Sequence, residues 1–571
     1  MIIPNHRRTN ESYRTRSLQK IAALLGLLAL AAAPVAAHSI DSRLDLPLLH
    51  VVKSLRAANS NRSLHVIVQT NGLPDAAMLS DFHRLGGTLK VRYQLIPALS
   101  GAIPARNITK LAARPWVCHI SSDFSIHKLD DYANAAVGAD FANNNDRVDG
   151  SGVTVAVLDS GIGSSNDFVN TFLLLFKTNR VINGPNFSSD STTNDLCGHG
   201  THVAGLIAGN GANSSGLLCY RTFKGVAPNA TLLNVKILNS FGVGSVSSAI
   251  SGLQWCVSNK AKYNIRVINL SMGHPVGESY TVDPLCQAVE AAWKAGIVVV
   301  CAAGNDGRSL PWDMDSPPAF GTVDSPGNDP YVITVGATKD LNTRSVSDDQ
   351  MATYSSHGPT RIDHILKPDI VAPGNKLISV AASNSYLYKT YIGTNGVYWT
   401  YYEVSLNGKF TWQYFVLSGS SMSAGLVSGA AALLIENSPS INPNTVKGRL
   451  MKTATKVWNP NVSYSPYYQG AGLLNIPAAL NSTDVVTGYA LSPTIYWNSD
   501  GTLSAQDVSG IWGDSAVWAD SAVWADSAVW ADSAIWADSA VWADSAVWAD
   551  SAVWADSAVW ADISYTAVAG E

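Results

Sequence analysis

Three short segments contain the residue types needed to activate a serine hydroxyl. They are VAVLDSGI around Asp159, GHGTHVAG around His199 and SGSSMSAGLVSG around Ser421. A serine hydroxyl is a poor nucleophile until a neighbouring imidazole accepts its proton, and a carboxylate holds that imidazole in the required tautomer. The segments therefore predict nucleophilic catalysis, with Asp159 as the acid, His199 as the base and Ser421 as the nucleophile.

The order of these residues along the chain separates the folds that share this chemistry. Asp, then His, then Ser is the order of subtilisins, whereas chymotrypsin-like enzymes and α/β-hydrolases use other orders. On these motifs the chain resembles the secreted subtilisin-like serine proteases, the subtilase family (peptidase family S8). The resemblance implies an endopeptidase that hydrolyses protein or peptide substrates through an acyl-enzyme on Ser421, with no cofactor required for the chemistry.

Two further segments resemble the substrate site of this family. In IVVVCAAGNDG, the residue that matches the family's oxyanion-binding asparagine is Asn305. INLSMGH resembles the strand along which a substrate peptide lies as an added strand. The resemblance implies that substrate is bound by Ser271, Met272, Gly273, Ala303 and Gly304. We expect a broad cleft for apolar or aromatic side chains, in which Asp306 could favour basic ones.

The chain departs from the family pattern close to the nucleophile. Ser420 stands where the family usually has threonine, and Gly425 replaces a proline. The serine keeps the hydroxyl, while glycine has more backbone freedom than proline. We expect these differences to affect rate and rigidity and to leave the reaction type unchanged.

Short apolar segments alternate with helix-like stretches around these motifs. They are Val153–Leu158, Leu232–Ile237, Val267–Leu270, Ile297–Cys301 and Tyr331–Val335. Such runs are typical of buried parallel strands, and the alternation predicts an α/β domain, a parallel sheet with helices on both faces. Catalytic groups of such sheets gather at the carboxyl ends of the strands. We assign this catalytic domain to residues 135–485.

Two segments precede the catalytic domain. Residues 1–37 combine basic residues, an apolar run and a small-residue site, so we expect a signal peptide cut after Ala37, a secreted protein and no membrane attachment after cleavage. A retained anchor is the alternative. Residues 60–130 predict a β-α-β-β-α-β order, typical of a ferredoxin-like α+β fold.

The unit at residues 60–130 resembles the inhibitor I9-type propeptide of the family. The resemblance implies a self-processing zymogen, in which the propeptide assists folding and inhibits the protease from within the same chain. We expect the processing cut between Ser125 and Asn134. The alternative is an ordinary N-terminal domain that stays attached.

The C-terminal segment 508–562 contains the hexapeptide Ser-Ala-Val-Trp-Ala-Asp, repeated from Ser515 onward. A six-residue period favours a β-rich solenoid, in which each repeat needs neighbours to bury its apolar face. A ladder of tryptophans could bind a glycan, a cell surface or another copy of the chain. A repeat expanded without a selected role is the alternative. The chain has no basic patch, which argues against nucleic-acid binding.

Other features give less specific expectations. Export permits disulfides, and we expect Cys197–Cys219 and Cys256–Cys286, with Cys301 a free core thiol; Cys197 could instead be a redox control on activity. The resemblance implies a structural calcium ion, with Asp167 as the candidate ligand. The aromatic-rich segment 398–416, which contains Asn407-Gly408, predicts a hairpin that forms either a rim of the cleft or a surface ornament.

Two other function classes remain open from the sequence. One is an adhesion protein with feeble catalysis, in which the repeat is the functional part. The other is an esterase or lipase, which the order of the three catalytic residues disfavours.

Overall fold

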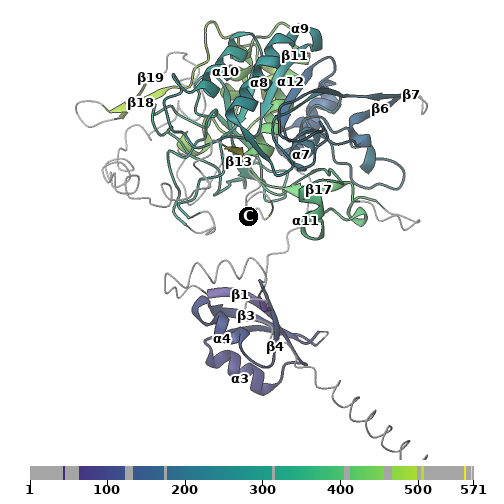
Figure 1. The fold of residues 1–571 in the computed structure, drawn as a ribbon, viewed down its shortest axis with the longest axis vertical. Helices are drawn as coiled ribbons and strands as arrows, with labels where there is room; N and C mark the ends of the chain where they lie inside the picture. The colour runs from purple at the N-terminus through teal and green to yellow at the C-terminus, as the bar shows by residue number, and fades with distance from the viewer. Residues whose placement is uncertain are drawn as a thin grey trace, which may run out of the picture. The chain divides into compact units, whose positions relative to one another are not determined.

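The computed structural model divides the chain into two compact units, residues 1–127 and 128–571 (Figure 1). The structure describes residues 43–44, 63–94, 96–122, 133–172, 176–310, 316–403, 412–455, 466–497, 503–506, 558–560 and 568. The expected signal peptide and most of the repeat lie outside the described residues. In the described part of the chain, no helix combines the length and the apolar character needed to cross a membrane.

The first unit contains a four-stranded antiparallel sheet in the order β2-β3-β1-β4. Its elements are β1 (Ser63–Thr70), α3 (Ala76–Arg84), β2 (Thr88–Arg92), β3 (Ala98–Pro104), α4 (Ile108–Ala112) and β4 (Val117–Ser122). The Asp75 side chain accepts from Met78 N–H at 2.8 Å and so caps α3. The predicted β-α-β-β-α-β order is confirmed. This unit has its own small hydrophobic core, which includes Phe82.

The second unit is built on an eight-stranded sheet in the order β14-β13-β12-β11-β5-β9-β8, with β15 also paired to β13. Its strands are β5 (Thr154–Asp159), β8 (Val181–Asn186), β9 (Thr231–Lys236), β11 (Ile265–Leu270), β12 (Val298–Ala302), β13 (Ile333–Lys339), β14 (Gln350–Met351) and β15 (Ile370–Pro373). All pairs are parallel except β13–β14. The predicted parallel sheet is confirmed.

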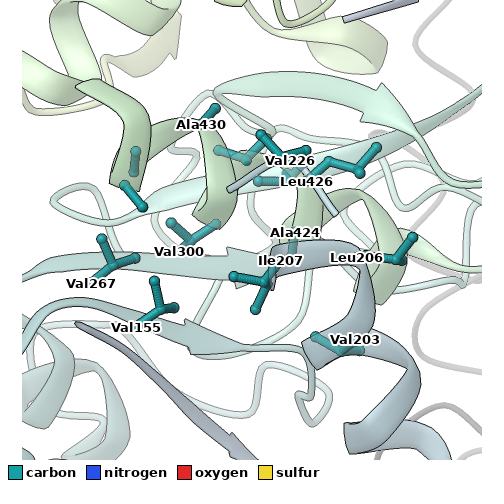
Figure 2. Packing of buried hydrophobic residues seen from close by; sticks show 14 of the residues in the cluster. Val155, Val203, Leu206, Ile207, Val226, Val267, Val300, Ala424, Leu426 and Ala430 are labelled. Carbon is teal, nitrogen blue, oxygen red and sulfur yellow. The ribbon is translucent and has the colours of Figure 1, made fainter. Parts of the chain in front are cut away.

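Helices cover both faces of this sheet. The main ones are α7 (His199–Ala208), α8 (Val246–Ser258), α10 (Pro284–Lys294), α12 (Ser420–Asn437) and α13 (Pro443–Lys452), while α11 (Tyr386–Asn395) packs on β17. On β5, Leu158 faces α8, because a Cβ built at Gly252 would lie 3.1 Å from Leu158 Cδ2. Val155 lies where α7 and α12 meet the sheet (Figure 2). Since odd and even residues of a strand point to opposite faces, α8 and α12 lie on opposite sides.

Shorter elements complete the second unit. They are α5 (Ala133–Ala136), α6 (Ala139–Phe141), β6 (Val169–Phe172), β7 (Phe176–Asn179), β10 (Val243–Ser245), α9 (Lys260–Tyr263), β16 (Leu377–Val380), β17 (Tyr414–Leu417), α14 (Pro466–Gln469), α15 (Ile476–Asn481), β18 (Thr494–Trp497), β19 (Leu503–Gln506) and β20 (Ala558–Trp560). The strand β20, within the last repeat, pairs antiparallel with β10.

The hairpin expected at 398–416 is wrong in the part that the structure describes. Residues 399–401 form a 3-10 turn, and β17 pairs with β16 instead of with the preceding aromatic run. The reason lies in side-chain packing. The rings of Phe223, Tyr402 and Tyr414 make edge-to-face contacts at 4.8 to 5.7 Å. The expected turn at Asn407-Gly408 lies outside the described residues.

The disulfide predictions Cys197–Cys219 and Cys256–Cys286 are also wrong, because all six cysteines have free thiols. The Cys286 thiol instead donates to Asn328 Oδ1 at 3.2 Å. Cys301 is the buried free thiol that we expected on β12. Burial raises the pKa of the Cys197 thiol, and a thiol that resists ionisation is unreactive, which argues against a redox control there.

Candidate active site

The acid and the base meet at the carboxyl end of β5. His199 Nδ1 lies 2.8 Å from Asp159 Oδ1 and 3.0 Å from Oδ2. Both side chains are buried, and Ser160 N–H also donates to Asp159 Oδ1, at 2.7 Å. A carboxylate in this position accepts a proton-bearing Nδ1 and leaves Nε2 as the basic nitrogen. The arrangement thus suits His199 to accept a proton from a hydroxyl.

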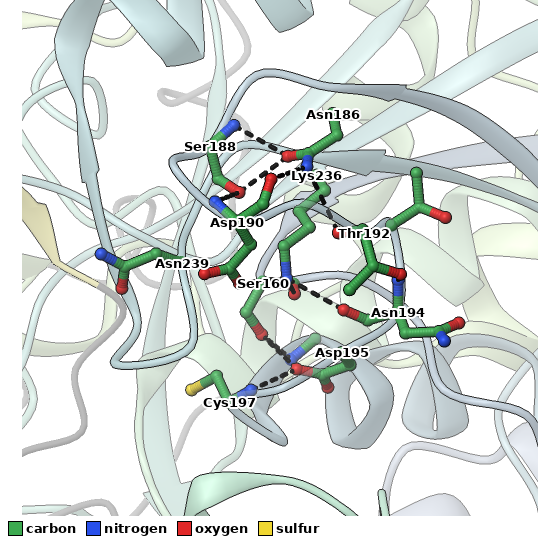
Figure 3. A network of polar contacts seen from close by, with 12 residues as sticks. Ser160, Asn186, Ser188, Asp190, Thr192, Asn194, Asp195, Cys197, Lys236 and Asn239 are labelled. Atoms are coloured by element: carbon green, nitrogen blue, oxygen red, sulfur yellow. Dashed lines mark hydrogen bonds and ion pairs between the residues drawn. The ribbon is translucent and has the colours of Figure 1, made fainter.

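A buried carboxylate next to this pair holds the start of α7 (Figure 3). Asp195 accepts five hydrogen bonds, from Ser160 Oγ, the N–H groups of Cys197, Gly198 and Thr201, and Thr201 Oγ1. Ser160 Oγ in turn accepts from Gly200 N–H at 3.0 Å. Because Ser160 follows the acid and Gly200 follows the base, these bonds fix the two catalytic backbones against each other.

Lys236, at the end of β9, binds the backbone of the same region. Its Nζ donates to Ser160 O at 2.5 Å and Asn194 O at 3.0 Å, and lies 3.0 Å from Asp190 Oδ2 (Figure 3). The lysine side chain is fully buried. A buried ammonium is costly unless polar groups surround it, so these three contacts make the position of the loop 190–195 highly specific.

The helices α7 and α12 bring the base and the nucleophile together. A Cβ built at Gly425 on α12 would lie 3.5 Å from Val203 O on α7, and one at Gly429 would lie 3.3 Å from Ile207 O. These contacts match residues four and eight positions after the histidine with residues four and eight positions after the serine. The two helices therefore run side by side in the same direction, and this register places Ser421 level with His199.

The nucleophile is fixed to the end of β11. Ser421 Oγ donates to Ser271 O at 3.2 Å, while Ser271 Oγ donates to Ser421 O at 2.9 Å. Ser271 Oγ also accepts from Asn269 Nδ2 at 2.9 Å, and Ser428 donates to the oxygen of the same amide. This chain of hydrogen bonds fixes the first turns of α12 in position against the carboxyl end of β11.

The predicted oxyanion residue lies beside the same turn. Asn305 Oδ1 accepts from Ser420 N–H at 2.9 Å, and Asn305 Nδ2 lies 3.1 Å from the position that a Cβ would take at Gly419. Ser420 Oγ contacts both Gly304 N (3.1 Å) and Gly304 O (3.0 Å). The hydroxyl kept at position 420 therefore ties the asparagine loop to the start of α12.

The predicted substrate residues follow two neighbouring parallel strands. Ser271, Met272 and Gly273 come directly after β11, and Ala303 and Gly304 come directly after β12. The Met272 and Ala303 side chains are buried in the core, so only their backbone atoms can face a substrate. Gly304 has a φ of 105°, a conformation that favours glycine.

The second histidine of α7, His202, does not belong to the chemical centre. His202 Nε2 lies 3.1 Å from both Leu377 O and Phe415 O, and burial lowers the His202 pKa to about 3. A histidine held neutral between two carbonyls has a structural role. This supports the choice of His199 as the base.

Asp167 does not have the surroundings of a calcium ligand. Its oxygens accept from Asn213 N–H and Tyr414 O–H, both at 2.7 Å, and burial raises the Asp167 pKa. Calcium requires several oxygen acceptors, and here hydrogen-bond donors face the carboxylate. Over the residues that the structure describes, there is no group of three or more His, Cys, Asp or Glu side chains suited to a metal ion. The donor set at Asp167 does not fit calcium.

Sequence reasoning missed Asp195 and Lys236. A lysine inside the apolar strand TLLNVKIL, and an aspartate in the small-residue segment before His199, are the signals that could have identified them.

Comparison with known proteins agrees with this geometry. The model of the subtilase family matches residues 150–472. Serine protease AprX of Bacillus subtilis (strain 168) is 36% identical over 357 residues, covering 61% of this chain and 70% of that protein. Subtilisin E of the same organism is 32% identical over 399 residues, covering 69% of this chain and 83% of that protein.

A crystal structure of a cold adapted subtilisin-like serine proteinase has 27% sequence identity and a TM-score of 0.39, covering 57% of this chain and 90% of that one. The family match itself spans more than half of the sequence and includes all three catalytic motifs. The chain therefore belongs to the subtilase family and is a serine endopeptidase.

Proposed function

We propose that the protein is a secreted, self-processing protease that hydrolyses peptide bonds through Asp159, His199, Ser421 and Asn305. The observation that carries the assignment is the 2.8 Å contact between His199 Nδ1 and Asp159, together with the matched register of α7 and α12. The register supports the placement of the nucleophile beside the basic nitrogen of the same histidine.

In the proposed reaction, Ser421 Oγ attacks the carbonyl carbon of a peptide bond while His199 Nε2 takes the hydroxyl proton. The carbonyl oxygen becomes an oxyanion, which accepts hydrogen bonds from Ser421 N–H and the Asn305 side-chain amide. His199 then gives its proton to the leaving amine, and Asp159 stabilises the imidazolium between these steps. Water repeats the sequence on the acyl-enzyme, releases the acid product and restores the serine.

A serine-directed probe tests the nucleophile. A fluorophosphonate should label the mature protein at Ser421, and Ser421→Ala should lose both the label and casein hydrolysis. Ser423→Ala is the matched control, since this buried serine of the same helix donates to Ala372 O, at 2.9 Å. Equal casein hydrolysis by wild type and Ser421→Ala would favour the adhesion-protein alternative.

We propose that the first unit is the propeptide and that the protease removes it. Its separate core and its position directly before the catalytic unit support this role. Wild type should cut itself between Ser125 and Asn134, whereas Ser421→Ala should accumulate as the uncut chain after the signal is removed. Intact mass and N-terminal sequencing of both proteins measure this. An uncut but active wild type would show that the unit is a permanent domain.

We also propose export through residues 1–37 and a binding role for the repeat. The basic and apolar pattern of the first segment supports export, and the pairing of β20 with β10 supports the view that a repeat can add as a strand to an exposed edge. A chain that ends at residue 506 should be exported and active and should lose binding to cell-wall glycan or to a second copy. Unchanged binding would argue for a repeat without a selected role.

A further inference from the structure

A carboxylate occupies the space between the two segments that we assign to substrate binding. Asp324 Oδ2 lies 2.8 Å from the position that a Cβ would take at Gly304, and 3.4 Å from the corresponding position at Gly273. Neither glycine has a side chain, so the two segments leave room for the Asp324 side chain between them. The negative charge thus lies against both walls of the substrate site.

The backbone around this carboxylate is tied to both segments. Asp324 N–H donates to Ala303 O at 3.0 Å, and the next residue, Ser325, exchanges hydrogen bonds with His274 at 2.9 and 3.0 Å. The buried Ser325 side chain also donates to Asp283 Oδ2 at 2.6 Å. These bonds fix residue 324 as the floor between the ends of β11 and β12.

The same two segments form hydrogen bonds with Ser420 and Ser421 at the start of α12. Ser421 Oγ donates to Ser271 O, and Gly304 contacts Ser420 Oγ through both its N–H and its carbonyl. A peptide carbonyl placed at Ser421 Oγ, with its oxygen toward Asn305, therefore has its own α-carbon between these segments. The side chain on that α-carbon would then extend between the two segments toward Asp324, which is half-buried.

We propose that Asp324 makes this protease cleave after lysine or arginine. The inference rests on the proposed function, because it concerns a peptide bound at that site. A carboxylate at this position attracts a cationic side chain and disfavours an apolar one, because contact with an apolar group removes water from the charge without an electrostatic gain. A hydrogen bond to a charged group corresponds to a preference of roughly 10- to 100-fold. The apolar or aromatic preference expected from the sequence would then be secondary.

Peptide anilides that differ only in the residue before the cleaved bond test this proposal. Lysine should exceed its uncharged analogue norleucine in kcat/KM by roughly 10- to 100-fold in wild type. In Asp324→Asn, which keeps the side-chain shape, this ratio should fall close to one. Asp324→Lys should reverse the charge preference and favour glutamate. Asp348→Asn is the matched control, because this aspartate accepts from Thr343 outside the site, and its ratio should equal that of wild type.

Two outcomes would overturn the proposal. One is a wild type that cleaves the norleucine or phenylalanine anilide as fast as the lysine anilide. The other is an Asp324→Asn variant that keeps the wild-type ratio. Failure of the proposed function is distinguishable, since it would remove hydrolysis of every anilide and fluorophosphonate labelling of Ser421 as well.

Discussion

Two clusters in which aspartate pairs with buried lysine lie at opposite ends of the same sheet. At the carboxyl ends of the strands, Lys236 pairs with Asp190 and donates to the backbone beside the catalytic acid. At the amino ends, Lys447 and Lys367 flank Asp369 at 3.2 and 2.7 Å. Lys447 also donates to the carbonyls of residues 330–332, which precede β13.

Both clusters pair buried lysine side chains with aspartate, but they have different neighbours. All three lysine side chains are fully buried. Buried ion pairs contribute little to stability on average, because desolvation offsets their attraction. Their effect therefore depends on what they hold in place. The carboxyl-end cluster holds the loop that orients His199, whereas the amino-end cluster holds the start of β13 and Ser492, which lie away from the catalytic residues.

The largest expected effect is on catalysis at the carboxyl end. Lys236→Met and Asp195→Ala should each lower kcat by about 100-fold, since they release the loop that aligns the base with the nucleophile. The KM for a peptide anilide should stay close to that of wild type, because the substrate segments follow other strands. Steady-state kinetics on both variants measures this. A change in KM with unchanged kcat would show that the loop binds substrate instead of positioning the histidine.

The amino-end cluster should affect stability without affecting kcat. Lys447→Met removes the hydrogen bonds of this ammonium to the carbonyls of residues 330–332 and its contact with Asp369, so the free energy of unfolding at pH 8 should fall by about 2 kcal/mol. Urea unfolding in a Ser421→Ala background, which prevents self-digestion, gives this value. The same substitution in the active protein should keep the wild-type kcat. A loss of kcat comparable to that of Lys236→Met would erase the distinction between the two ends.

The pH dependence of stability sharpens the comparison further. Burial lowers the pKa of Lys447 from 10.5 to about 7, with Asp369, Lys367 and Asp329 as the charged groups that face it. Between these values the unfolded chain binds a proton that the folded chain lacks, so stability rises with pH in this window. Below it both states are protonated, and the burial cost is fully present.

The stability difference between the Ser421→Ala protein and its Lys447→Met derivative should therefore grow between pH 7 and pH 9. Denaturant unfolding at a series of pH values measures it. A pH-independent difference would mean that the ammonium stays protonated in the fold throughout this range.

The smallest expected effect concerns Gly425, between α7 and α12. A Cβ there would meet its nearest neighbours at 3.5 Å, an ordinary contact, so Gly425→Ala fits without strain. The substitution should raise the free energy of unfolding by about 0.5 to 1 kcal/mol, because it restricts the unfolded chain. Gly429→Ala is the contrasting variant, since its Cβ would lie 2.6 Å from Val226 Cβ and should destabilise the protein. Stabilisation of both variants would contradict this packing.

The sequence allowed prediction of the features that depend on local pattern. A few consecutive residues are enough to recognise the apolar runs of β5 and β11. The same holds for the motifs around Asp159 and Ser421. The prediction of a hairpin at 398–416 was wrong because aromatic residues favour strands only on average. Here the rings pack against Phe223, a partner that the local sequence does not reveal. The disulfides failed because spacing along the chain does not fix which thiols meet.

Contacts between distant segments explain the residues that were missed. Asp324 is recognisable only when β11 and β12 are adjacent, since its carboxylate lies in space left by glycines 273 and 304. Asp195 acts through five donors that gather only once α7 begins at His199. Such roles follow from the sheet order, which the sequence pattern leaves undetermined.

The common direction of α7 and α12 has an electrostatic consequence. The peptide dipoles of each helix add up to a partial positive charge at its first turn, and the first turns of both helices meet at the reaction centre. Negative charge that develops on a substrate oxygen there is stabilised by about 0.3 to 1 kcal/mol per helix. Because this field comes from the main chain, it persists in variants that lack the serine or the asparagine, and it should give them a residual affinity for anionic inhibitors.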